Sequence, residues 1–129
     1  MTRAVEYLDL EDVVRIASML LGDPPPIRDL GLLGAAVDRP RTTLFGCDAY
    51  PDLVVKAAAM LQSIVNNHPL VDGNKRLGWV ATASFLEING VSASRLDNDD
   101  VFDFVMWVAS SNPELEQISE RLQRLVSTL

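Results

Sequence analysis

Hydrophobic residues along this chain recur mainly at the three- and four-residue spacing of α-helices, and strands are scarcely indicated. Prolines, glycines and short polar clusters separate the periodic segments. The pattern predicts six helices, over about residues 9–21, 28–37, 51–67, 73–88, 97–108 and 112–129. The last helix carries the clearest stripe, formed by Leu115, Ile118, Leu122, Leu125 and Leu129.

Several residues mark where these helices begin and end. Asp9 is expected to cap the first helix, and Asn112, followed by Pro113, to cap the last. The helix over 73–88 is apolar or small on almost every side, which is typical of the buried centre of a bundle.

Residues 39–48 have no helical period and predict a loop or small hairpin. We therefore expect an all-α chain, a single compact bundle of about six helices with a short flap or hairpin before the third, forming one domain over residues 1–129.

Composition and charge narrow the classes of function. The 129 residues carry a formal net charge of −7, which argues against a general nucleic-acid binder but leaves room for a nucleotide pocket. The single cysteine, Cys47, and the single histidine, His68, exclude a disulfide framework and multi-cysteine or multi-histidine metal sites. We expect Cys47 to be a small packing residue. No secretory signal or membrane-spanning run is visible, so the expected location is cytoplasmic, without a membrane partner.

The candidate site residues, which are polar or charged, lie between the third and fourth predicted helices and in the first turn of the fourth. Gly73, Asn74, Lys75 and Arg76 occupy the first turn of a helix, where free N–H groups and the positive end of the dipole attract an anion. The preceding carboxylate, Asp72, is suited to hold Mg²⁺ against phosphate oxygens. His68 stands a few residues upstream, with Pro69 keeping it out of helical geometry, where it can take a proton from a hydroxyl. A general base, a carboxylate for the metal ion, an anion-binding helix terminus and nearby cations are the groups that phosphoryl transfer requires.

The same residues also have a purely structural interpretation. His68 and Asp72 could serve only as helix caps, and Lys75 and Arg76 could simply be solvated. Two cations in the first turn of a helix oppose its dipole, however, which is unfavourable unless an anion binds there. The group as a whole therefore favours a phosphate site.

Residues 68–76 read HPLVDGNKR and resemble the motif of the Fic family, H-P-F-x-[DE]-G-N-G-R-x-x-R. Lys75 replaces the second glycine of that motif and Trp79 its final arginine, and both changes are similar to the death-on-curing (Doc) branch of the family. Leu70 stands where phenylalanine is usual and is expected to remain an apolar anchor under the loop.

The resemblance implies a Doc-type protein kinase toxin. Such enzymes transfer the γ-phosphate of ATP to a threonine hydroxyl of elongation factor Tu and arrest translation. By position, His68 would be the general base, Asp72 the Mg²⁺ ligand, and Gly73, Asn74, Lys75 and Arg76 the phosphate-binding residues. Two alternatives remain: a Fic-type AMP transferase, which positions 75 and 79 count against, and a non-catalytic binding domain, which the intact motif residues count against.

The resemblance also implies a separate inhibitor. The inhibitory helix motif of some Fic proteins, [ST]-x-x-x-E-[GN], is absent from the 129 residues. We therefore expect a Phd-like antitoxin whose C-terminal segment folds into an apolar groove bordered by the N-terminal helices and the active-site loop, with an acidic rim. The elbow at residues 22–26 would belong to this surface. Residues 39–46 correspond to the family's flap, where Arg41 and Thr43 could contact the target or nucleotide, although an ordinary surface loop fits equally well.

Overall fold

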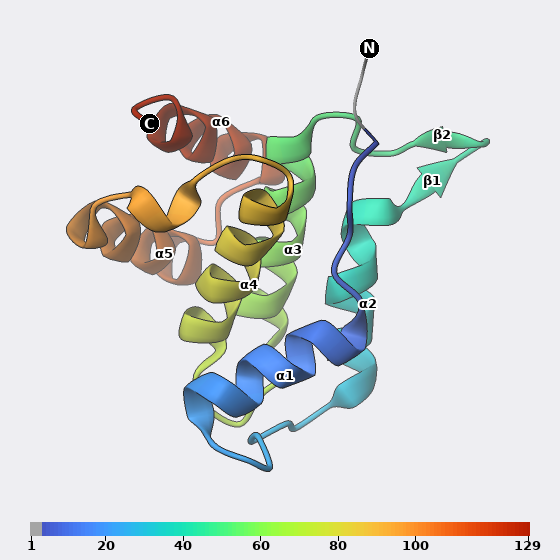
Figure 1. The fold of residues 1–129 in the computed structure, drawn as a ribbon, viewed down its shortest axis with the longest axis vertical. Coiled ribbons are helices and arrows are strands. Elements are labelled where there is room, and N and C mark those ends of the chain that lie inside the picture. Colours follow the sequence, from blue (N-terminus) through green and yellow to red (C-terminus); the bar gives the residue numbers. More distant parts are fainter. Residues whose placement is uncertain (1–3) are drawn as a thin grey trace.

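The computed structural model describes residues 4–129, and its helices and single hairpin confirm the all-α prediction (Figure 1). No helix within this part of the chain has the length and apolar character needed to cross a bilayer. The elements are α1 (Leu10–Leu21), α2 (Leu30–Asp38), the 3-10 turn η1 (Arg39–Arg41), β1 (Thr43–Leu44), β2 (Cys47–Asp48), α3 (Leu53–Asn67), α4 (Asn74–Ile88), the 3-10 turn η2 (Ala93–Arg95), α5 (Asn98–Ser111) and α6 (Leu115–Val126).

The centre of the bundle is α3, which packs against α4, α2 and α6 (Figure 1). Nine of its fifteen residues are buried, compared with seven of the fifteen in α4. The prediction that residues 73–88 form the centre is therefore only partly right. One side of α4 packs on α3, while Trp79 and Val80 are only partly buried and line a surface groove.

The helix ends follow the expected capping chemistry at some positions and depart from it at others. Asp9 caps α1 as predicted, in a reciprocal capping box with Asp12. Asn112 does not start α6; it ends α5 in the left-handed conformation (φ 46°), which asparagine tolerates well. The capping box of α6 is formed instead by Glu114 and Gln117.

The predicted hairpin is present, as an antiparallel pair in which Leu44 faces Cys47. It lies beside the N-terminal end of α3, whereas residues 68–73 follow the C-terminal end of that helix (Figure 1). A helix of fifteen residues is roughly 22 Å long, so the hairpin and the loop 68–73 lie at opposite ends of α3. Cys47 is exposed, so the prediction that it is a small packing residue is wrong.

The base of the hairpin is fastened to the bundle by two cations. Lys56, fully buried in α3, donates to Asp48 at 3.1 Å and to the Pro40 carbonyl at 3.3 Å. Arg41 donates to the Leu8 carbonyl, and its guanidinium lies 4.9 Å from the centroid of the Tyr7 ring. Arg41 therefore links the hairpin to the N-terminal segment, and it is not among the residues that line the cleft beside His68.

Candidate active site

The C-terminal end of α3 and the N-terminal end of α4 meet at the loop 68–73, and a cleft of about 320 Å³ opens beside this loop. Its volume is at the lower end of the usual range for small-molecule sites. All six residues predicted for the site line this one cleft. The lining residues are Val65, His68, Val71, Asp72, Gly73, Asn74, Lys75, Arg76 and Ala109.

His68 ends α3 in the left-handed conformation, with φ 52° and ψ 58°. Pro69 was expected to exclude helical geometry here, and the residue is indeed non-helical, but it is not in the extended conformation that most residues adopt before proline. A non-glycine residue in the left-handed region carries a cost of about 1–2 kcal/mol. The exposed imidazole is thus presented to the cleft from a backbone conformation that neighbouring groups must hold in place.

Asn74 supports the loop through its side chain. Its Oδ1 accepts from the Leu70 N–H at 2.9 Å, and its Nδ2 donates to the Leu70 carbonyl at 3.0 Å. Leu70 is 1% exposed, which confirms the predicted apolar anchor under the loop. Because both ends of the Asn74 amide are engaged, its side chain does not reach for phosphate as expected. What it offers an anion is its backbone N–H.

The first turn of α4 has the features of an anion site. Gly73 precedes it with φ 88°, and the first helical bond runs from the Leu77 N–H to the Gly73 carbonyl at 2.9 Å. The N–H groups of Asn74, Lys75 and Arg76 consequently have no acceptor within the helix. Lys75 and Arg76 are exposed, the turn contains no acidic residue, and within residues 4–129 neither cation pairs with a carboxylate. This concentration of positive charge favours a bound anion.

Asp72 lies at the same cleft as these cations, with its side chain exposed. Its Oδ1 accepts from the Gly73 N–H at 2.9 Å, which fixes the carboxylate while leaving oxygen lone pairs free. Among the described residues there is no group of three or more His, Cys, Asp or Glu side chains suited to a metal. A single carboxylate fits Mg²⁺, which characteristically takes one or two carboxylates and completes its shell with water and phosphate oxygens.

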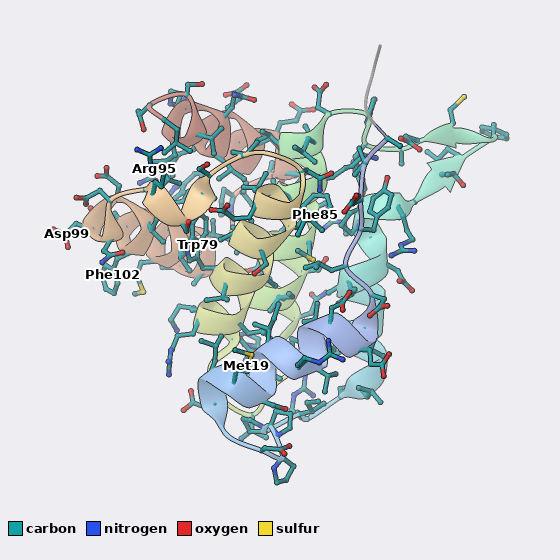
Figure 2. The ribbon with its side chains drawn as sticks, in the orientation of Figure 1. Met19, Trp79, Phe85, Arg95, Asp99 and Phe102 are labelled. Carbon is teal, nitrogen blue, oxygen red and sulfur yellow. The ribbon has the colours of Figure 1, made fainter. Side chains whose placement is uncertain are left out.

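A second, apolar groove of about 410 Å³ adjoins the cleft and shares Lys75 and Arg76 with it. Figure 2 shows Trp79 on α4 directed toward α5, where its ring meets Phe104 edge-on at 6.3 Å. The groove was expected between the N-terminal helices and the active-site loop, but α4 and α5 form most of it and α1 adds only one residue. The lining residues are Leu20, Lys75, Arg76, Trp79, Val80, Asn98, Val101, Phe102, Val105 and Met106.

One residue at the loop was not anticipated from the sequence. Arg28 stands in the segment between α1 and α2, and its guanidinium donates to the carbonyl of His68, 40 residues away. Nothing in the local pattern around Arg28 signals this contact, because hydrophobic periodicity and motif spacing report only on near neighbours in the chain.

Comparison with known proteins agrees with the geometry. The family model described as the Fic/DOC family matches residues 7–86, which include α1 to α3, the loop 68–73 and most of α4. The chain is also similar to the protein named Toxin Doc of Mycolicibacterium smegmatis, with 50% identity over 118 residues, covering 91% of each chain. On the match over most of its length and on this identity, the chain belongs to the Fic/DOC family.

Proposed function

We propose that this protein is a Doc-type toxin that acts as a protein kinase, transferring the γ-phosphate of ATP to a threonine hydroxyl of elongation factor Tu and thereby arresting translation in the cytoplasm. The observation that carries the proposal is the first turn of α4. There Lys75 and Arg76 stand without carboxylate partners among the described residues, at the same cleft as His68. The 50% identity to a protein named Toxin Doc supports it.

In the proposed reaction, the free N–H groups at the start of α4 and the side chains of Lys75 and Arg76 hold the phosphates. His68 accepts the proton of the threonine hydroxyl as the oxygen bonds to the γ-phosphorus. The bond from that phosphorus to the bridging oxygen of the β-phosphate breaks, and ADP leaves. Asp72 would hold Mg²⁺, which neutralises charge on the phosphates when bound.

Two residues favour phosphate transfer over AMP transfer. Lys75 places a long cationic side chain where the common Fic motif has glycine, so the phosphates cannot lie as they do in enzymes with glycine there. Trp79 stands at the position of the final arginine of the motif, and its ring packs against Phe104. The site therefore lacks the second arginine that the AMP-transferring members supply.

We further propose that the apolar groove between α4 and α5 receives the C-terminal segment of a Phd-like antitoxin. Phe102 is 64% and Met106 37% exposed, so two large apolar side chains are available to a partner. Because Lys75 and Arg76 line both the groove and the cleft, a segment seated in the groove would also cover these two cations. Coexpression with the neighbouring open reading frame should relieve toxicity. A chain that is harmless alone, yet active when purified without a partner, would contradict this assignment.

The experiment that tests the kinase proposal uses ATP labelled separately at the α- or the γ-phosphorus, with purified elongation factor Tu as acceptor. We expect label on the factor only from γ-labelled ATP. Label from α-labelled ATP would support the Fic-type AMP transferase instead, and label from neither would support a non-catalytic binding domain. His68→Ala, incubated with each of the two labelled forms of ATP, is the matched control, because label that it still transfers would come from a contaminating kinase.

A further inference from the structure

Arg28 makes three hydrogen bonds to the end of α3, although it precedes that helix in the chain. Its Nε donates to the His68 carbonyl at 2.8 Å, and one terminal nitrogen donates to the same carbonyl at 2.5 Å and to the Asn67 carbonyl at 3.1 Å. These carbonyls belong to the last residue of α3 and to its cap, where the helix provides no donors. The positive guanidinium also complements the negative end of the α3 dipole.

The backbone around Arg28 is fixed to the same loop. The N–H groups of Arg28 and Asp29 both donate to the Pro69 carbonyl, at 2.8 and 3.0 Å, and the Val71 N–H donates to the Pro26 carbonyl at 2.8 Å. An antiparallel bridge joins Ile27 to Leu70. These backbone hydrogen bonds therefore fix the position of the Arg28 backbone relative to the loop, and the guanidinium is anchored next to the carbonyls that it binds.

The hydrogen bonds from Arg28 stabilise His68, the loop residue whose backbone conformation is unfavourable. His68 has a positive φ, a conformation that costs free energy in any residue other than glycine. Two of the three bonds from Arg28 end on the His68 carbonyl, whose orientation follows directly from the backbone angles of that residue. A guanidinium can donate from two nitrogens to one acceptor in a fixed plane, which a lysine ammonium cannot reproduce.

From these contacts we infer that Arg28 is a positioning residue for His68. It holds the backbone of the general base in the left-handed conformation and so sets the direction of the imidazole toward the acceptor hydroxyl. The inference rests on the proposed function, in which His68 is the base. It assigns Arg28 no contact with ATP, because the nucleotide-binding groups lie on α4 and the 320 Å³ cleft does not include Arg28.

The test compares Arg28→Gln and Arg28→Lys with Arg15→Gln, an exposed arginine on α1 whose one ion pair, to Asp12, is long at 3.9 Å. We expect Arg28→Gln to lower kcat for phosphate transfer by about 10- to 100-fold with KM for ATP unchanged, because misplacement of a reacting group costs rate and not nucleotide binding. Arg28→Lys should recover part of the loss, and Arg15→Gln should behave as wild type. An unchanged kcat in Arg28→Gln would overturn the inference. So would a loss of activity that merely follows the unfolded fraction in a thermal melt.

A second measurement does not depend on the reaction. His68 is the only histidine in the chain, so its imidazole signals in a proton–carbon correlation spectrum are unambiguous. Arg28→Gln should shift or broaden these signals while the rest of the spectrum stays native, and Arg15→Gln should leave them unchanged. Unmoved His68 signals in a folded Arg28→Gln protein would refute the positioning role. If wild type transfers no phosphate from ATP, the proposed function fails, and the spectra still decide whether Arg28 positions His68.

Discussion

Asn74 and Leu70 are joined by two hydrogen bonds, in which the side-chain amide of Asn74 both accepts from and donates to the backbone of Leu70. Both residues are buried. The contact therefore ties the first residue of α4 to the middle of the loop 68–73 through buried hydrogen bonds, so that loss of one partner leaves a buried polar group unpaired. Asn74 also has a free backbone N–H in the first turn of α4, so the residue that holds the loop with its side chain has its N–H available to an anion.

Replacing this side chain should damage both stability and activity. We expect Asn74→Ala to lower the free energy of unfolding by about 1–3 kcal/mol, because it leaves the buried polar groups of Leu70 unpaired. Denaturant titration measures the loss, and phosphate transfer should fall with it. Asn66→Ala is the control, since the Asn66 side chain bonds only to Asn112 at an exposed position. Equal stability of the two variants would contradict the role given to Asn74.

Gly73 should be intolerant of a side chain for two separable reasons. Its φ is 88°, and an added Cβ would lie 2.8 Å from both terminal carbons of Leu21. Gly90 has a similar φ of 89° but open space around it. Each alanine variant should lose about 1–2 kcal/mol of stability from its backbone conformation. Gly73→Ala should lose more stability than Gly90→Ala. Part of this extra loss should disappear when Leu21→Ala is introduced into the Gly73→Ala variant, because the clash with Leu21 is then removed. Equal losses at both glycines would show that the Leu21 contact is unimportant.

The cations of the anion site should contribute directly to nucleotide affinity. Hydrogen bonds to charged groups contribute about 1.5–3 kcal/mol, so Lys75→Ala and Arg76→Ala should each weaken ATP binding by about 10- to 100-fold. Isothermal titration calorimetry gives the Kd, and Arg15→Ala is the control, because Arg15 is an exposed arginine that does not line the cleft. Binding as tight as in wild type would place the phosphates elsewhere. Lys75→Gly restores the common Fic residue but should yield an inactive protein, because Trp79 still replaces the second arginine.

Glu87 provides a prediction on the pH dependence of stability. Its carboxylate accepts from the hydroxyl and the backbone N–H of Ser94, and these bonds lower the pKa of Glu87 below its ordinary value of 4.5. A lowered folded-state pKa stabilises the fold above pH 4.5, and the contribution is lost as the pH falls through the folded-state pKa. Ser94→Ala should therefore be less stable than wild type at pH 7, with the difference shrinking in acid. A difference that is independent of pH would contradict this account.

The parts of the site that could be predicted from sequence are close together along the chain. His68, Asp72, Lys75 and Arg76 fall within nine residues, so the capping and dipole rules that apply to one loop and one helix start were enough to group them. The side chain of Asn74 was predicted to bind phosphate, but in the structure it bonds to the backbone N–H and carbonyl of Leu70. The sequence does not reveal these hydrogen bonds, because they depend on the folded shape of the loop.

Contacts between distant segments could not be predicted in this way. Arg28 reaches His68 across 40 residues, and Lys56, in an apolar helix, is buried because Asp48 and the Pro40 carbonyl meet it there. Asn112 shows a different limit, since asparagine suits both the start and the end of a helix, and only the neighbouring Glu114–Gln117 capping box decides between them.

The proposed transfer of phosphate, and not of AMP, from ATP to elongation factor Tu depends on His68 as the general base. It is tested most directly by the intact mass of the factor after incubation with ATP and either wild type or His68→Ala. Wild type should add the mass of one phosphoryl group to the factor, and His68→Ala, folded and still binding ATP, should be slower by about 10²- to 10⁴-fold or more. A gain equal to AMP, or a His68→Ala protein as active as wild type, would contradict it.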